Sequence, residues 1–256
     1  MNHALTIGIL GGMGPDATNR LAELITLMTP AVQDQDHIPV ITYNNSKIPS
    51  RVEAILRDGP SPAPEMVRSA RVLEAAGADL IIVPCNCAHF YLDAVQRSVS
   101  IPVLNMIEQT VKYTVKHFPE AATVGLLAST ATIASELYSE PLARHGRNLL
   151  TPAREEQEEK VMEAIYGPWG IKAGFRTKPR ALLTEVAQSL VDRGADLLIA
   201  GCTEVSLVIA GKRSPFPVVD PMEVIARAAV RFALSGTQVK QQSVLCPSGQ
   251  LTLVTA

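Results

Sequence analysis

Two cysteines stand at matching places in two similar segments of the chain. The segment G-A-D-L-I-I-V-P-C ends at Cys85, and the segment G-A-D-L-L-I-A-G-C ends at Cys202. Each cysteine follows a short apolar run of the kind that forms a buried strand. Two thiols that face one carbon from opposite sides can remove a proton from one face and return a proton to the other. The reference pKa of a thiol, about 8.5, suits both the base and the acid of such an exchange.

A second pair of segments repeats the same spacing. T-I-G-I-L begins at Thr6 and T-V-G-L-L begins at Thr123, which is an offset of 123 − 6 = 117 residues. The two G-A-D segments are offset by 194 − 77 = 117 residues as well. Two unrelated α/β units with similar strand ends would share one offset only by chance, so the spacing indicates an internal duplication.

Short β-branched runs alternate with longer amphipathic segments in both halves. This alternation predicts an α/β fold with parallel sheets that helices cover on both faces. The expected strands are Thr6–Leu10, Val40–Tyr43, Leu80–Val83, Val103–Asn105, Thr123–Leu127, Leu197–Ala200 and Val218–Val219. The expected helices are Thr18–Met28, Ala63–Ala76, Ala181–Arg193 and Pro221–Leu234.

The duplication predicts two homologous domains related by a pseudo-twofold axis. We expect residues 1–115, completed by the helix near 221–235, to carry Cys85, and residues 116–220 to carry Cys202. Residues 236–256 have no counterpart in the first half, and no structure is predicted for them. Because ligands of parallel sheets bind at the carboxyl ends of the strands, both cysteines should reach one shared cleft.

The composition excludes several classes of protein. The chain is 47% hydrophobic and 19% charged, which is typical of a folded domain. Its net charge of −2 does not indicate a basic surface that would bind nucleic acid or a membrane. The N-terminus lacks the pattern of a signal peptide, and no apolar run is long enough to span a bilayer. The cysteines at 85, 87, 202 and 246 do not form a secreted disulfide framework, so we expect a cytoplasmic protein.

Polar residues beside the cysteines are candidates for binding a small substrate. Asn86 and Thr203 follow the two cysteines at the start of helix-like stretches, where backbone N–H groups can bind a carboxylate. The loop G-G-M-G-P, which contains Met13, lacks the spacing of a nucleotide-binding loop and is better suited to a small carboxylated ligand. Thr130, in the equivalent loop of the second half, and Asn44, at the end of the second expected strand, are further candidates.

A zinc site is the main alternative for the thiols. Cys85, Cys87, His89 and Cys202 are possible ligands, but the usual C-x2-C spacing is missing. A metal would also occupy the thiols that the acid/base pair needs. We therefore expect no metal.

Several motifs together resemble the aspartate/glutamate racemase superfamily, and within it the aspartate racemase branch. The resemblance covers Thr6 to Leu234 and rests on six segments: G-G-M-G-P (11–15), Y-N-N-S-K-I-P-S-R (43–51), P-C-N-C-A-H (84–89), G-I-K-A-G (170–174), G-C-T-E-V (201–205) and D-P-M (220–222). In that branch the chain is similar to the stand-alone aspartate racemases of cyanobacterial peptide biosynthesis. The resemblance implies two four-stranded parallel α/β domains with the site between them, no pyridoxal phosphate, no metal and a homodimer.

The resemblance also implies roles for individual residues. Cys85 and Cys202 match the catalytic pair, while Asn86 and Thr203 would hold the α-carboxylate or the amino group. Arg51 and Lys172 would supply the positive charge that selects an acidic side chain, which agrees with the ability of a guanidinium to grip a carboxylate with two hydrogen bonds.

One residue departs from the family pattern. Cys87 stands where the family usually has threonine, so a third thiol lies beside the expected site in place of a hydroxyl. We expect Cys87 to be a substrate-binding residue, with a catalytic role as the alternative.

The expected activity is the interconversion of L- and D-aspartate without a cofactor, on a small acidic amino acid and with no nucleic acid or membrane involved. Glutamate or a β-substituted aspartate is an open alternative as the substrate. Other members of the superfamily, namely maleate isomerase, arylmalonate decarboxylase and hydantoin racemase, are rival enzymes. A non-catalytic amino-acid-binding protein is the rival from another class, since two α/β lobes around a cleft also describe binding proteins.

Overall fold

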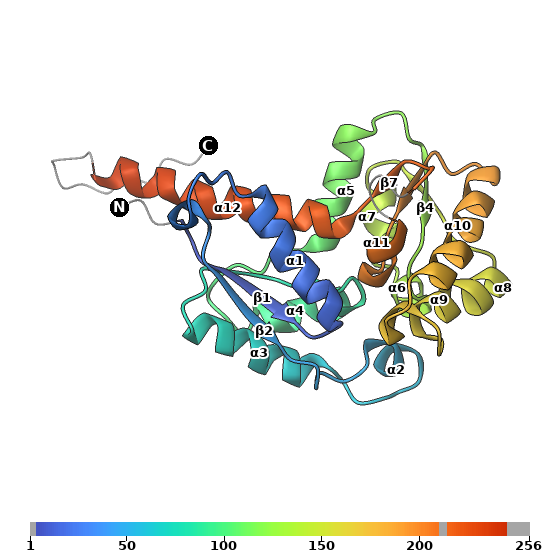
Figure 1. The fold of residues 1–256 in the computed structure, drawn as a ribbon, viewed down its shortest axis with the longest axis horizontal. Coiled ribbons are helices and arrows are strands. Elements are labelled where there is room, and N and C mark those ends of the chain that lie inside the picture. Colours follow the sequence, from blue (N-terminus) through green and yellow to red (C-terminus); the bar gives the residue numbers. More distant parts are fainter. Residues whose placement is uncertain (1–3, 210–213, 245–256) are drawn as a thin grey trace.

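Two parallel sheets form the framework of the chain (Figure 1). The structure is a computed structural model that describes residues 4–209 and 214–244, with the side chains of the last helix described up to residue 235. The first sheet has the order β2-β1-β3, and the second has the order β5-β4-β6-β7. The strands are β1 (Ile7–Gly11), β2 (Val40–Asn44), β3 (Leu80–Ile82), β4 (Thr123–Leu126), β5 (Asn148–Leu150), β6 (Leu197–Ile199) and β7 (Val218–Val219). The predicted α/β class with parallel sheets is confirmed.

The first sheet has three strands and not the four that were expected. The predicted strand Val103–Asn105 is reduced to a single bridge between Ile81 and Val103. The strand does not extend, because Asn105, two residues after Val103, caps a helix. The Asn105 side chain accepts a hydrogen bond from the Glu108 N–H at 3.1 Å. The second sheet has four strands, and one of them, β5, was not expected from the sequence.

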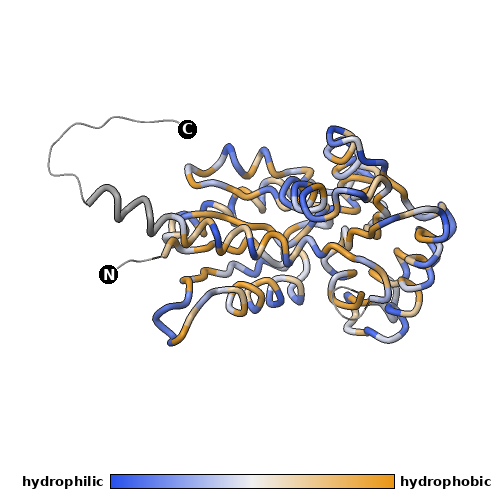
Figure 2. The backbone as a smooth tube through the Cα atoms, turned by 90° about the horizontal axis from the view of Figure 1, so that it is seen from above, coloured by the Kyte–Doolittle hydropathy of each residue, from blue (hydrophilic) through white to orange (hydrophobic). Residues whose placement is uncertain are grey.

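Helices cover both faces of each sheet. On the first sheet, α3 (Ala63–Ala75) and α4 (Leu92–Gln96) pack on one face, and α1 (Pro15–Met28) and α12 (Pro221–Val244) pack on the other. On the second sheet, α10 (Thr177–Asp192) and α11 (Thr203–Ile209) cover one face, and α5 (Met106–His117) and α7 (Ser139–Ala143) cover the other. Figure 2 shows hydrophobic segments running through the interior and hydrophilic segments at the outer turns.

The remaining elements are short. They are η1 (Asp34–Asp36), α2 (Arg51–Leu56), η2 (Cys87–Tyr91), α6 (Thr130–Ala134), α8 (Arg154–Glu156), the π-helical turn η3 (Gln157–Met162), α9 (Glu163–Tyr166) and η4 (Ile171–Ala173). Several of them follow the carboxyl ends of strands. In the described part of the chain, no helix is both long and apolar enough to cross a membrane.

Two helices belong to the cores of both halves. Helix α5 places Met106 against the first sheet and Ile107 against the second. Helix α12 does the same with Ile225 and Val224. These shared helices hold one sheet against the other. Helix α12 also runs past its expected end, to Val244. The rest of the predicted tail, with the cysteine at 246, lies outside the described residues. The domain boundaries stay a prediction.

The duplication reappears in the hydrogen bonds of the two halves. The Thr6 N–H donates to the Asp79 carboxylate at 2.7 Å, and the Thr123 N–H donates to the Asp196 carboxylate at 2.9 Å. Both pairs are separated by 73 residues and are related by the offset of 117. In each half the aspartate therefore fixes the strand before the cysteine against the first strand of that half.

Two glycines with the same backbone conformation provide a test of this packing. Gly12 and Gly77 both have φ of 97°, but a Cβ on Gly12 would meet the Asn45 backbone at 2.2 Å, whereas a Cβ on Gly77 would meet nothing within 4 Å. We expect Gly77→Ala to cost about 1–2 kcal/mol of stability from left-handed strain alone. Gly12→Ala should cost more than about 3 kcal/mol, because the backbone has to move as well. Urea unfolding measures both values, and equal losses would contradict the close approach at Gly12.

Candidate active site

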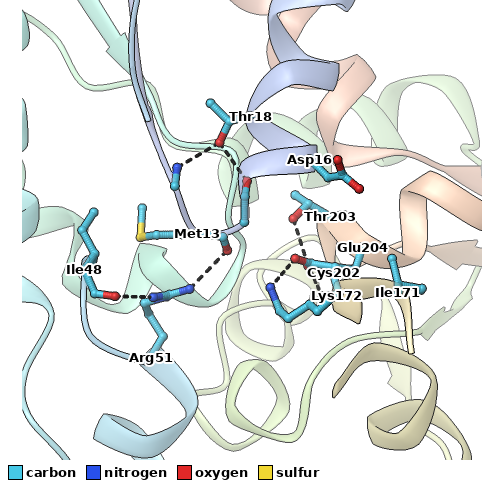
Figure 3. A network of polar contacts seen from close by, with 12 residues as sticks. Met13, Asp16, Thr18, Ile48, Arg51, Ile171, Lys172, Cys202, Thr203 and Glu204 are labelled. Atoms are coloured by element: carbon cyan, nitrogen blue, oxygen red, sulfur yellow. Dashed lines mark hydrogen bonds and ion pairs between the residues drawn. The ribbon is translucent and has the colours of Figure 1, made fainter. Parts of the chain in front are cut away.

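A cleft lies between the two halves, at the carboxyl ends of the strands (Figure 3). Its walls come from the loops that follow β1, β3, β4 and β6, which is where parallel sheets bind ligands. The lining residues are Met13, Arg51, Cys85, Asn86, Cys87, Ser129, Thr132, Tyr166, Gly201, Cys202, Thr203 and Glu204. The structure therefore brings seven of the ten predicted site residues together, including both cysteines of the expected pair.

All three cysteines of the cleft are buried and reduced. Cys85, Cys87 and Cys202 are 7%, 6% and 8% exposed. Cys85 immediately precedes the turn that leads into η2, and Cys202 immediately precedes α11. The two thiols of the expected pair thus stand at equivalent strand ends.

A carboxylate lies directly beside Cys202. The Cys202 thiol donates to Glu204 Oε2 at 3.0 Å, and Lys172 Nζ forms an ion pair with Glu204 Oε1. Burial opposes ionisation of Glu204, but the Lys172 charge and the hydrogen bonds from Lys172 and Cys202 lower its pKa below the usual range. Burial and the Glu204 charge raise the pKa of Cys202. The Cys202 sulfur is therefore held as a protonated thiol next to an ionised carboxylate.

The first half differs from the second at the position that corresponds to Glu204. The offset of 117 maps Glu204 onto Cys87, since 204 − 117 = 87. Burial, and the charge of Cys85, raise the pKa of Cys87 to about 12, so this third thiol is neutral near pH 7. Cys85 therefore has a neutral neighbour where Cys202 has a carboxylate. The two halves of the cleft are electrostatically unequal.

An asparagine in the cleft has its side chain oriented by a buried tyrosine. The Tyr138 hydroxyl donates to Asn86 Oδ1 at 2.6 Å, and Tyr138 is 1% exposed. Asn86 is buried, and its Nδ2 has no hydrogen-bond partner in the described part of the chain. Because a buried donor without a partner is costly, this amide group is suited to a ligand that accepts a hydrogen bond.

Arg51 is a fixed cation at the edge of the cleft. Its guanidinium donates to the carbonyls of Met13 at 3.2 Å and Ile48 at 3.3 Å (Figure 3). It also donates to the Pro49 carbonyl at 2.7 Å. Its Nε is buried without a partner, and no carboxylate within the described residues forms an ion pair with it. The backbone holds this charge in place without neutralising it.

Three predicted residues are not part of the cleft lining. Asn44 is exposed at the end of β2, because side chains alternate along a strand and it is Asn45 that turns inward, to hydrogen-bond Ser69. The Thr130 hydroxyl donates to Glu158 at 2.8 Å, outside the cleft. Lys172 lies behind Glu204, to which its ammonium group is bound.

Six residues of the site were not among the candidates from the sequence: Ser129, Thr132, Tyr138, Tyr166, Gly201 and Glu204. The repeat could have revealed Glu204, because it stands at the same offset from Cys202 as Cys87 from Cys85. Ser129 and Thr132 lie next to the predicted Thr130 in the same loop, so their hydroxyls could also have been predicted as site groups. Neither tyrosine has a signal in the sequence, since both come from segments without a counterpart among the motifs.

His89 holds the loop of Cys85 in place. The Met106 N–H donates to Nε2 of His89 at 3.0 Å, so the proton of the neutral ring is on Nδ1, which donates to the Cys85 carbonyl at 2.8 Å. Burial lowers the pKa of His89 to about 4. The neutral ring therefore links the Cys85 loop to the start of α5. In the described part of the chain, no group of three or more His, Cys, Asp or Glu side chains could hold a metal ion.

The buried imidazole predicts a loss of stability in acid. The unfolded chain takes up the proton below pH 6.5 and the folded chain only near pH 4, so stability is lost as the pH falls through this window. From pH 7 to pH 4 the contribution amounts to about 3 kcal/mol. Urea unfolding at several pH values should show a shallower dependence in His89→Gln than in the wild type, and the wild-type dependence in His145→Gln, whose histidine is exposed. Identical profiles for all three proteins would show that His89 is not buried in its neutral form.

The fold and the cleft define an α/β protein that carries two thiols to matching strand ends between two parallel sheets. The model of a family described as Asp/Glu/Hydantoin racemase matches residues 10–229 of the chain. The chain belongs to this racemase family, and it is an amino-acid racemase. The resemblance predicted from the motifs is confirmed, and the alternative of a non-catalytic binding protein is disfavoured.

Individual relatives differ in their described substrates. The broad-specificity amino-acid racemase RacX of Bacillus subtilis (strain 168) is 28% identical over 237 residues, which cover 90% of this chain and 98% of the relative. The structure of Picrophilus torridus aspartate racemase has 30% identity and a TM-score of 0.79, covering 90% of this chain and 94% of that chain. Glutamate racemase of Roseiflexus sp. (strain RS-1) is 28% identical over 193 residues, 72% of this chain and 66% of the relative.

Proposed function

We propose that the protein racemises an acidic amino acid, aspartate in the first place, with the thiols of Cys85 and Cys202 as the acid/base pair and without pyridoxal phosphate. The observation that carries the proposal is that these two buried thiols line one cleft at the ends of matching strands. Racemisation needs two proton-transfer groups on opposite faces of Cα. A duplicated strand end supplies two such groups.

The neighbours of the two thiols fit the two roles. The Cys202 sulfur keeps its proton beside Glu204 and is ready to act as the acid. Cys85, whose neighbour Cys87 is neutral, acts as the thiolate that removes the α-proton. After one turnover Cys85 carries the proton and Cys202 is the thiolate, so the opposite enantiomer reacts in reverse. Proton exchange with water returns either form to the resting state.

The backbone and Asn86 would stabilise the intermediate. Removal of the α-proton places negative charge on the α-carboxylate, and donors that already point to that position lower the barrier. Nδ2 of Asn86 has no partner among the described residues, and the Thr203 hydroxyl donates to Glu204 Oε2 at 3.3 Å. Tyr138 positions Asn86 so that its N–H groups, and not its oxygen, meet the substrate.

An acidic side chain fits the charge of the cleft. Arg51 and Lys172 carry two positive charges against one negative charge on Glu204, and Arg51 has no acidic partner among the described residues. A guanidinium with free N–H groups is suited to a second substrate carboxylate. The similarity to an aspartate racemase structure supports aspartate. Its similarity to glutamate racemases keeps glutamate as the second candidate.

Three cysteine variants test the assignment of the thiols. We expect Cys85→Ala and Cys202→Ala each to lower the rate of L-aspartate inversion at least about a thousandfold, which corresponds to about 4 kcal/mol of transition-state stabilisation. Cys87→Ala is the matched control: it removes a buried thiol two residues from Cys85 and should keep inversion within about tenfold of the wild type. Chiral chromatography measures the rates, and circular dichroism checks the fold of each variant.

Two outcomes would overturn this assignment. If Cys85→Ala or Cys202→Ala inverts aspartate at the wild-type rate, the two-thiol mechanism is wrong. If Cys87→Ala is the inactive variant and Cys85→Ala is active, the base belongs to the third thiol. Wild-type rates for aspartate, glutamate and a non-acidic amino acid, measured together, decide the substrate class.

A further inference from the structure

A basic pocket lies between α5 and α12, the two helices that belong to the cores of both halves. The two helices pack on each other near the middle of the molecule (Figure 1). The pocket has a volume of about 110 Å³, whereas one water molecule needs only about 10–15 Å³ of such volume. It therefore admits a group of several non-hydrogen atoms. None of the residues that line it also lines the reaction cleft.

Four residues of the lining carry positive charge and none is acidic. Lys112 and Lys116 come from α5, and Arg227 and Arg231 come from α12. Each pair is four residues apart, so its members lie on one face of their helix. All four are exposed, and none forms an ion pair with another residue in the described part of the chain. Glu223, one turn before Arg227, does not line the pocket.

This concentration of charge does not serve the stability of the fold. Like charges at a spacing of four residues destabilise a helix, and here two such pairs face one pocket. The chain as a whole has a net charge of −2, so the pocket also runs against the overall charge balance. An anion between the two helices would turn this repulsion into attraction.

The remaining walls of the pocket provide hydrogen-bonding groups. Gln109 contributes an amide, and the rings of Tyr113 and His117 lie against each other with their centroids 4.2 Å apart. Phosphate oxygens accept hydrogen bonds from ammonium groups and, two at a time, from a guanidinium. Four cations around one concave space match a compact ligand with several negative charges. A flat membrane surface would not reach into such a space.

We infer that this pocket binds a small polyphosphate anion, either inorganic or as the triphosphate group of a nucleotide. The bound anion would contact both α5 and α12. Because each of these helices contributes to the cores of both sheets, a ligand that ties them together should stabilise the folded protein by mass action. The inference goes beyond the proposed racemase function and does not depend on the substrate of the cleft.

Calorimetric titration tests the pocket without any assay of activity. We expect wild-type protein to bind inorganic triphosphate and ATP saturably, one per chain, at constant ionic strength and without divalent cations, and its unfolding temperature to rise with either ligand. The double variant Lys116→Gln/Arg227→Gln removes one charge from each helix and should bind at least about tenfold more weakly.

A second double variant controls for overall charge. Arg97→Gln/Arg180→Gln removes two exposed arginines outside the pocket and should bind triphosphate within about twofold of the wild type. Circular dichroism checks the fold of both double variants. Tighter binding of ATP than of triphosphate would identify a nucleotide as the ligand, and equal binding would identify the phosphate groups alone as what is recognised.

Three results would overturn the inference. These are no binding of either probe by the wild type, equal weakening in the two double variants, and binding only to vesicles that contain phosphatidic acid. The second result would show attraction to net charge, and the third would assign this face to a membrane surface. Loss of racemase activity in a cysteine variant leaves all three measurements unaffected, so the pocket and the proposed function fail independently.

Discussion

Two proton-transfer groups can serve one carbon only if the protein holds them on opposite faces of it, and the rest of the structure follows from this constraint. In the proposed mechanism, the thiols of Cys85 and Cys202, at equivalent strand ends, are the groups. If the two halves packed independently, the distance between the two thiols could vary. Helices α5 and α12 prevent this, because each contributes buried side chains to the cores of both sheets. The precision of the site is thus a property of shared packing.

The same constraint requires thiols in a buried place, where ionisation is costly. In the second half, Glu204 accepts the hydrogen bond of Cys202 and forms an ion pair with Lys172, and its charge adds to the cost of ionising Cys202. In the first half the corresponding residue is the neutral Cys87, so no second negative charge lies beside Cys85. In the proposed mechanism, this inequality favours Cys202 as the thiol that keeps its proton. Cys87 stands at the position that corresponds to Glu204 and is uncharged near pH 7.

Much of this arrangement can be predicted from the sequence because it depends on local patterns that occur twice. The strand ends and both cysteines follow from apolar runs and a common offset of 117 residues. The fourth strand of the first sheet was wrong because Asn105 caps α5, a competition that propensity does not decide. Asn44 and Thr130 do not line the cleft, because Asn44 is exposed at the end of β2 and the Thr130 hydroxyl donates to Glu158. Tyr138 could not have been predicted, since it meets Asn86 across 52 residues and belongs to no repeated segment.

In the proposed mechanism two different groups act on the two faces of the substrate, and the position of deuterium in the earliest products reports on this. L-aspartate is incubated with the wild-type protein in D2O and sampled before about a tenth of it has inverted. Because the base that removes the α-proton is not the acid that returns one, the D-aspartate formed should carry deuterium at Cα while the remaining L-aspartate keeps its original hydrogen. Deuterium that appears equally in both enantiomers from the first samples would indicate a single base, and would contradict the account.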